Sequence, residues 1–199
     1  MKPVGGEIVA LRPSDAVRVE ELSDEGLVAA CAIADRAARA LLFERHVDCV
    51  HRFVARMRAS DADTVDDLVQ QTFLAAFTAA GTFRGGNVRG WLYGIAANLV
   101  RTYARGEIRR KAALQVVADL TPAPRRPRDP VVVARLQAAI EQLPHDLRAA
   151  LVLVDLEGEK GSDAADALGV PAGTLWRRVF HARKAVREAL AGKPTGGIA

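Results

Sequence analysis

Residues 143–190, LPHDLRAALVLVDLEGEKGSDAADALGVPAGTLWRRVFHARKAVREAL, decide how the last third of this chain folds. Within them, Ala165, Gly169 and Leu175 follow the spacing A-x3-G-x5-L. A small residue lets two helices cross closely, a glycine makes the tight turn between them, and an aliphatic residue fixes the second helix on the first. The stretch therefore predicts a helix-turn-helix whose second helix begins at Pro171.

The second helix of this motif carries a polar face. Thr174, Arg177, Arg178 and His181 are spaced at i, i+3, i+4 and i+7, so they share one side of the helix. A helix that is held by its back and presents cations at its front fits the major groove of DNA. We therefore expect this face to bind DNA.

Composition sets wider limits on the chain. Its 199 residues allow one domain or two small ones. A composition with 50% hydrophobic but only 5% aromatic residues favours small helical bundles. The net charge of +4 suits a polyanionic partner. We find no apolar run of about 18 residues and no secretion signal, so we expect no membrane span. Cys31 and Cys49 do not make a disulfide framework, which favours a cytoplasmic location.

Upstream of the motif, apolar residues recur at helical spacing. Ser23 marks the start of a first helix, and an apolar stripe continues as far as Met57. Between Val65 and Ala80 the apolar residues follow a strict i+4 pattern: Val65, Val69, Phe73 and Phe77. The opposite side of that helix carries acids and amides: Asp66, Asp67, Gln70 and Gln71.

A fourth helix follows the glycine-rich loop at residues 83–87, and Asn87 is placed to cap it. Its predicted core face consists of Leu92, Ile95, Ala96, Leu99 and Tyr103. Further helices are expected over residues 131–142, from Pro144 to Glu157, and over residues 162–168. No useful strand-like alternation is present, so the chain is predicted to be all-α.

Residues 120–130 divide the chain, because four prolines exclude both helix and sheet and leave an extended linker. We therefore predict two small helical domains joined by a Pro/Arg-rich linker. The expected bounds are a disordered leader at 1–21, a first domain at 22–111, a linker at 112–130, a second domain at 131–191 and a tail at 192–199.

Two sets of motifs resemble the extracytoplasmic-function (ECF) sigma factors. DDLVQQTF at 66–73, FRGG at 83–86 and WLYGIAANL at 91–99 are similar to the promoter-opening domain of that family. Residues 143–158, LGVP at 168–171 and HARK at 181–184 are similar to its second DNA-binding domain. The resemblance covers residues 22–191, and both sets occur in the family's order. It implies a specificity subunit of RNA polymerase that recognises the −35 and −10 promoter elements and assists promoter melting.

The resemblance implies a docking face for core RNA polymerase, which contributes its β′ and β subunits as partners. In the family the acidic-amide helix docks on a coiled coil of β′, and here it carries Asp66, Asp67, Gln70 and Gln71. Without the resemblance, a solvated helix face is the more frequent explanation of such a pattern.

The loop after Phe83 and the fourth helix would meet the −10 element as double-stranded and melted DNA. Opening a duplex requires pockets and stacking faces for extruded bases, and cations for the phosphates. Tyr93 lies off the apolar stripe and is a stacking candidate, whereas Trp91 fits the core better. The implied contact residues are Arg84, Asn87, Arg89, Tyr93, Asn98, Arg101 and Arg105.

One departure from the family lies on this helix. Gly94 and Ala97 occupy positions where many members carry arginine, so the face is less basic than usual. This puts in doubt which residues contact the phosphates.

The second domain would read the −35 element through its polar face. Arginine bonded to guanine is the commonest specific contact. Trp176 fits either packing on sugar edges or covering an adjacent helix. The implied contact residues are Thr174, Trp176, Arg177, Arg178, His181, Arg183 and Lys184. In the family the linker, basic here at Arg125, Arg126 and Arg128, threads toward the polymerase active centre, although a plain spacer also fits.

No pattern in the sequence supports catalysis, a cofactor or a metal site. His46 and Cys49 share a helix face, but His51 is rotated away, so three ligands do not converge. Two other functions stay open: a free-standing helix-turn-helix regulator, and a metal or redox sensor that uses Cys31, Cys49 and nearby histidines. An anti-sigma factor as a partner suits a flexible linker, although no residue demonstrates it.

Overall fold

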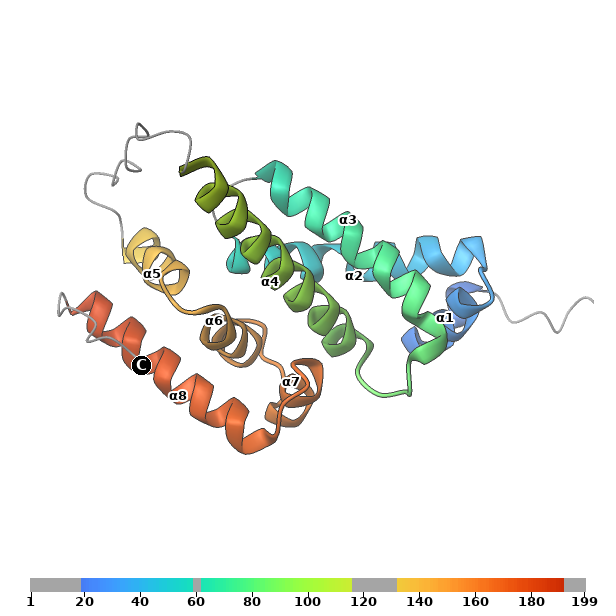
Figure 1. The fold of residues 1–199 in the computed structure, drawn as a ribbon. Coiled ribbons are helices and arrows are strands. Elements are labelled where there is room, and N and C mark those ends of the chain that lie inside the picture. The colour runs from blue at the N-terminus through green and yellow to red at the C-terminus, as the bar shows by residue number, and fades with distance from the viewer. Residues whose placement is uncertain (1–18, 59–61, 116–131, 192–199) are drawn as a thin grey trace, which may run out of the picture.

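The computed structural model describes residues 19–58, 62–115 and 132–191, which form helices and no strands (Figure 1). The all-α prediction is confirmed. The elements in chain order are a 3-10 turn Val19–Glu21, α1 Asp24–Ala32, α2 Arg36–Met57, α3 Ala62–Ala79, a 3-10 turn Ala80–Thr82, α4 Val88–Gln115, α5 Val132–Glu141, α6 His145–Leu151, a π-helical turn Val152–Leu156, α7 Gly161–Ala167 and α8 Ala172–Leu190. None of the described helices combines the length and apolarity needed to cross a membrane.

Side-chain caps explain where several of these helices begin. Ser23 Oγ accepts a hydrogen bond from the Gly26 amide at 3.2 Å, so Ser23 caps α1 as predicted. Asp35 caps α2 in the same way. Asn87 Oδ1 accepts from the Gly90 amide at 3.0 Å, which confirms its predicted place at the start of α4. Each cap satisfies a backbone N–H that has no partner inside its own helix.

The first half, α1–α4, buries the apolar stripes that the sequence predicts. Val65, Val69 and Phe73 of α3 are buried, and Phe77 is partly buried. The aromatic rings of Phe53 and Tyr93 pack with their centroids 4.8 Å apart between α2 and α4.

The second half, α5–α8, contains the predicted helix-turn-helix. Ala165 is 4% exposed and Leu175 is fully buried. Gly169 has a backbone φ of +62°, in the left-handed region that residues with a side chain rarely adopt. The three positions of the spacing therefore have the predicted roles of close crossing, turn and anchor.

The two halves pack against each other. The first part of α4 contacts α7, and α2 contacts α6 and the π-helical turn. In Figure 1, α4 lies between α3 on one side and α6 and α7 on the other. The guanidinium of Arg148 in α6 donates a hydrogen bond at 2.7 Å to the carbonyl of Met57, at the end of α2. The sequence does not predict this contact between halves.

The predicted domain bounds are only partly covered by the described residues. Helix α4 continues to Gln115, so it runs past position 111 into the predicted linker. Most of the leader, the proline-rich part of the linker and the tail lie outside the described residues, and so do Arg125, Arg126 and Arg128. The domain bounds stay a prediction.

Candidate nucleic-acid and polymerase interfaces

The acidic-amide face of α3 is open to solvent. Asp66, Asp67, Gln70 and Gln71 are all exposed, while the opposite side of the helix is buried in the first half. Only Asp66 has an ionic partner in the described chain, His51, whose Nε2 lies 3.4 Å from its carboxylate. The face is therefore accessible to a basic partner, and its role stays a prediction.

Helix α8 presents most of the predicted −35 residues outward. Leu175, Val179 and Ala182 hold its back against the rest of the second half. Arg177 and His181 are exposed, and Thr174 is partly exposed. Arg178 is partly buried because its guanidinium pairs with the Asp146 carboxylate at 3.0 Å. In this state Arg177 is the more available arginine for a base.

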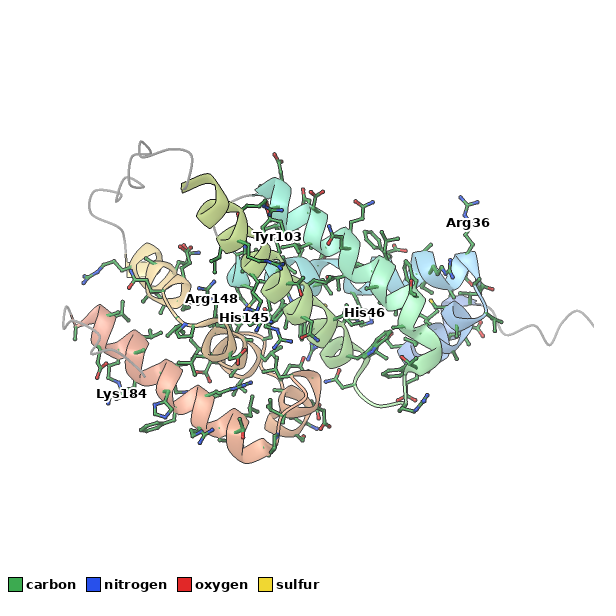
Figure 2. The ribbon with its side chains drawn as sticks, in the orientation of Figure 1. Arg36, His46, Tyr103, His145, Arg148 and Lys184 are labelled. Carbon is green, nitrogen blue, oxygen red and sulfur yellow. The ribbon has the colours of Figure 1, made fainter. Side chains whose placement is uncertain are left out.

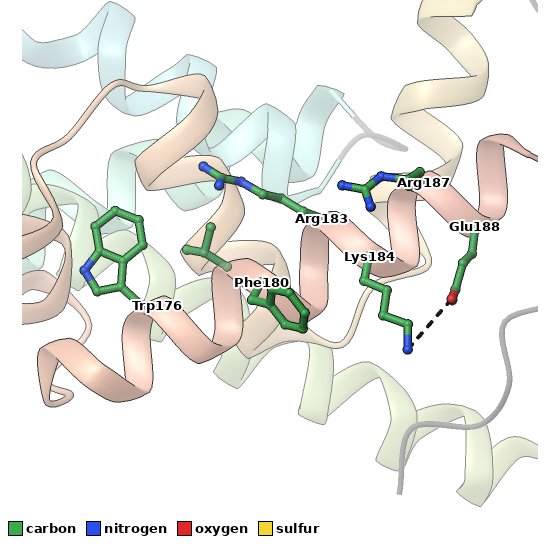
Figure 3. Close-up of a pocket in the computed structure, with 7 residues that line it drawn as sticks. Trp176, Phe180, Arg183, Lys184, Arg187 and Glu188 are labelled. Carbon is green, nitrogen blue, oxygen red and sulfur yellow. Dashed lines mark ion pairs between the residues drawn. The ribbon is translucent and has the colours of Figure 1, made fainter.

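A shallow hollow on α8 brings apolar and basic side chains together (Figure 3). Trp176 lies against the start of α7, where a Cβ on Gly161 would come within 2.6 Å of its indole. Trp176 thus covers the adjacent helix while staying 49% exposed. Arg183 donates two hydrogen bonds to the Asp155 carboxylate, at 2.9 and 2.6 Å, and Lys184 lies 4.0 Å from Glu188.

Phe180 is a residue of this hollow that sequence reasoning missed. It is 65% exposed, and its ring lies 5.5 Å from that of His181. Its position four residues after Trp176, on the same side of the helix, was the signal that could have found it.

The predicted −10 residues fall into two groups. Arg84, Asn98 and Arg105 are exposed, and Arg101, which is partly exposed, donates a hydrogen bond to Asn98 at 2.7 Å. Tyr93, by contrast, is fully buried. Its ring packs against that of Phe53 inside the first half, and its hydroxyl donates to Glu157 Oε2 of the second half at 3.0 Å. A stacking role for Tyr93 stays a prediction, and it requires the ring to leave its packing on Phe53 as well as the second half to move away.

The segment of the second half that makes this contact is residues 157–163, here called the acidic loop, which runs from the end of the π-helical turn into the first turn of α7. Glu159 accepts hydrogen bonds from Arg89 Nε at 2.6 Å and from Asn87 Nδ2 at 2.7 Å. Asp163 accepts a second bond from Asn87 at 3.1 Å. Two more of the predicted −10 residues are therefore engaged by the second half.

The backbone geometry at the start of the acidic loop directs the loop toward the first half. The Glu157 amide donates to the Val152 carbonyl five residues back, which closes the π-helical turn. Gly158 follows in a left-handed conformation, with φ +70. This wide turn and the reversal after it place the carboxylates of Glu157 and Glu159 against α2 and α4.

Burial at this contact changes the acidity of two groups. It raises the pKa of the Tyr93 phenol, with further contributions from the Cys49 thiol and Glu157. Burial also raises the pKa of Cys49, so this thiol stays protonated near neutral pH. Both groups are held in their neutral forms beneath the second half.

His145 lies between α6 and α4, close to Arg148 (Figure 2). Burial lowers the pKa of His145 to about 4, helped by Arg101, Arg148 and Arg105 and opposed by Asp146. The folded chain binds this proton more weakly than the unfolded chain does. The neutral imidazole therefore makes its full contribution to the free energy of unfolding above about pH 6.5. This contribution is lost as the pH falls from there toward 4.

We expect acidification to lower the melting temperature through His145. After a discount for the exposed part of the ring and for solvent screening, the free energy of unfolding falls by about 1 kcal/mol, which lowers the melting temperature by about 2–4 °C. Circular dichroism melts at pH 7 and pH 5 measure it. The His145→Gln variant is expected to lose less between the two pH values. An equal loss in both proteins would assign the pH dependence to other groups.

The histidines considered as metal ligands have carboxylate partners instead. His46 Nε2 lies 3.0 Å from Asp24 Oδ2, and His51 contacts Asp66. The Cys49 thiol donates to the His46 carbonyl at 3.1 Å. These side chains therefore serve contacts within the first half.

Comparison with known proteins matches each half of the chain to a known family model. Residues 42–110 match sigma-70 region 2, and residues 134–186 match sigma-70 region 4. The chain is 34% identical to the ECF RNA polymerase sigma factor SigM of Mycobacterium tuberculosis over 178 residues, which cover 88% of this chain and 89% of that one.

The chain belongs to the ECF sigma factors. It is also 34% identical over 159 residues to the ECF sigma factor SigE of Mycolicibacterium smegmatis; the match covers 75% of this chain but spans only 60% of that relative. A solved structure of the sigma factor RpoE with the anti-sigma factor NepR, from Bartonella quintana, aligns with a TM-score of 0.58 at 25% identity, over 75% of this chain and 94% of that one. As an ECF sigma factor, the chain directs promoter-specific initiation by RNA polymerase.

Proposed function

We propose a division of labour among three surfaces of this ECF sigma factor. The face of α3 at Asp66, Asp67, Gln70 and Gln71 docks on the core polymerase. The −10 element is bound by Arg84, Asn87, Arg89, Tyr93, Asn98, Arg101 and Arg105, and the −35 element by Thr174, Trp176, Arg177, Arg178, His181, Arg183 and Lys184. The observation that carries the proposal is that α8 is held by its apolar back and presents Arg177 and His181 to solvent.

We infer that bond formation belongs to the core polymerase, and that the chain acts in the cytoplasm without a cofactor. The test is a pull-down with core polymerase, followed by run-off transcription on a library of genomic promoters. Promoter-specific transcripts that require the chain support the proposal. Binding to DNA without any affinity for the polymerase would favour a free-standing regulator instead.

The Arg177→Ala variant is expected to reduce promoter-specific transcription about tenfold while core polymerase binding is unchanged. One bidentate contact to guanine contributes about 1–3 kcal/mol of discrimination. Run-off transcription at limiting promoter concentration measures the loss. Arg36→Ala is the matched control, because Arg36 is exposed at the far end of α2 (Figure 2). A weaker polymerase pull-down by Arg177→Ala would contradict the division of labour.

We also propose that an anti-sigma factor binds this chain, as NepR binds the RpoE of Bartonella quintana. The hollow at Trp176 and Phe180 supports the proposal, because exposed apolar side chains with a polar rim are typical of protein docking sites.

A further inference from the structure

We propose that the acidic loop of the second half acts as an intramolecular lid that competes with promoter DNA for the −10 face. In the closed state its carboxylates take the place of DNA phosphates. The inference rests on the proposed function, because it takes Asn87 and Arg89 to be DNA-binding residues. It goes further in assigning the closed arrangement a regulatory role.

Glu159 carries the first part of the argument. Its side chain is only 2% exposed, yet it is a carboxylate on a loop. Burial of a charge is costly unless the charge is paired and hydrogen-bonded. The side chains that pair with Glu159, Arg89 and Asn87, both come from the first half. The side chain of Glu159 is therefore satisfied in the closed arrangement by groups that the first half supplies.

Glu157 forms the second contact of the lid. Its side chain is 3% exposed and pairs with Arg56, and the guanidinium of Arg52 lies 3.9 Å away. Arg56 also donates to the Leu156 carbonyl at 3.0 Å. The other carboxylate oxygen of Glu157 accepts a hydrogen bond from the hydroxyl of Tyr93. This hydrogen bond keeps the Tyr93 hydroxyl away from solvent.

The chemistry of these contacts matches that of DNA binding. Arginine and asparagine are standard donors to phosphate oxygens, and a carboxylate accepts from the same donors at similar distances. Arg89 and Asn87 cannot bind the loop and a phosphate in the same geometry at once. Tyr93 differs from them, because Glu157 holds its hydroxyl while its ring packs on Phe53 within the first half. Loop and DNA therefore exclude each other at Arg89 and Asn87.

Gly94 shows how closely the halves approach. A Cβ added at Gly94 would lie 2.4 Å from the carbonyl oxygen of Ala167 in α7. That oxygen belongs to the backbone, which cannot move aside as the end of a flexible side chain can. The absence of a side chain at position 94 is therefore a requirement of closure.

The Gly94→Ala variant tests the lid directly. Alanine favours the helical state of α4 over glycine, so the variant opposes closure without weakening its own helix. Gly106→Ala is the matched control: it makes the same change in the same helix, where nothing lies within 4 Å of the added Cβ. A second variant, Glu157→Gln with Glu159→Gln, removes the charges of the lid. Its control is Glu21→Gln with Glu44→Gln, which changes the net charge equally at exposed positions.

Two measurements on the full chain report the result. Small-angle X-ray scattering gives the radius of gyration. Fluorescence anisotropy gives the affinity for a fluorescein-labelled, mixed-sequence single strand of about 16 nucleotides. Both lid variants are expected to have a larger radius of gyration and to bind the strand about tenfold more tightly, because a closed population reduces the apparent affinity in proportion. Both controls are expected to match the wild type.

Two outcomes would overturn the lid. One is an unchanged radius of gyration and affinity in both lid variants. The other is opening without tighter binding, which would show that the loop does not cover the DNA site. Failure of the proposed function looks different: the wild type would not bind core polymerase or support run-off transcription, whatever the lid variants do. Circular dichroism confirms that each variant is folded.

Discussion

Replacing Leu175 with alanine is expected to destabilise the second half by about 2–5 kcal/mol. Leu175 is fully buried and fixes α8 on the helix before it, so its removal leaves a cavity at the centre of the helix-turn-helix. Urea unfolding followed by circular dichroism measures the loss. A loss of this size is a large part of the stability of a small domain. DNA binding is expected to fail in parallel, because the polar face of α8 loses its fixed direction.

Leu74→Ala is the control for this prediction. Leu74 lies on α3 and is 57% exposed, so its truncation is expected to change the free energy of unfolding by less than about 0.5 kcal/mol. Equal losses in the two variants would show that the Leu175 anchor is not central to the motif.

Reversing the charge of the α3 face has the largest expected effect on function. The double variant Asp66→Lys with Asp67→Lys is expected to weaken core polymerase binding at least about 100-fold, because like charges placed together at an interface cost several kcal/mol. A quantitative pull-down at moderate salt measures it. Binding of single-stranded DNA is expected to persist, since this face is separate from the −10 residues.

The control variant is Glu44→Lys with Asp48→Lys, which reverses two exposed acids on α2. Loss of the Asp66–His51 pair contributes little to either result, because both side chains are at least half exposed. If both double variants lose the polymerase equally, the effect follows net charge rather than the α3 face.

The helices and their caps were predictable because their signals are local. Ser23 and Asn87 cap helices through residues three positions away, and the buried stripe of α3 follows directly from i+4 spacing. The same holds for Ala165 and Leu175 in the helix-turn-helix. In each case the residues that decide the structure are neighbours in the chain.

The contact between the halves was not predictable in this way. Tyr93 lies off the predicted apolar stripe of α4 and so suggests an exposed side chain, yet its ring is buried against Phe53 and its hydroxyl is bonded to Glu157, 64 positions later in the chain. Glu157 and Glu159 look like ordinary loop acids until their partners on α2 and α4 are known. Periodicity describes one helix at a time, and it does not say which surface a distant loop will cover.

Gly94 gains a physical explanation from the structure. On sequence grounds, this departure from the family is only a missing cation on a DNA-binding face. The structure adds that α7 approaches too closely for a side chain at this position. The resemblance to the family therefore informs on DNA binding, whereas the departure at Gly94 informs on how closely the two halves pack.

The two tryptophans of this protein lie in different halves. Trp91 packs against Phe83, with ring centroids 5.1 Å apart, whereas Trp176 packs against Gly161. Each indole thus emits from its own surroundings. Replacing one of them with phenylalanine leaves a single emitter, so spectra recorded during denaturant titration will show whether the halves melt together or one after the other, with no added dye.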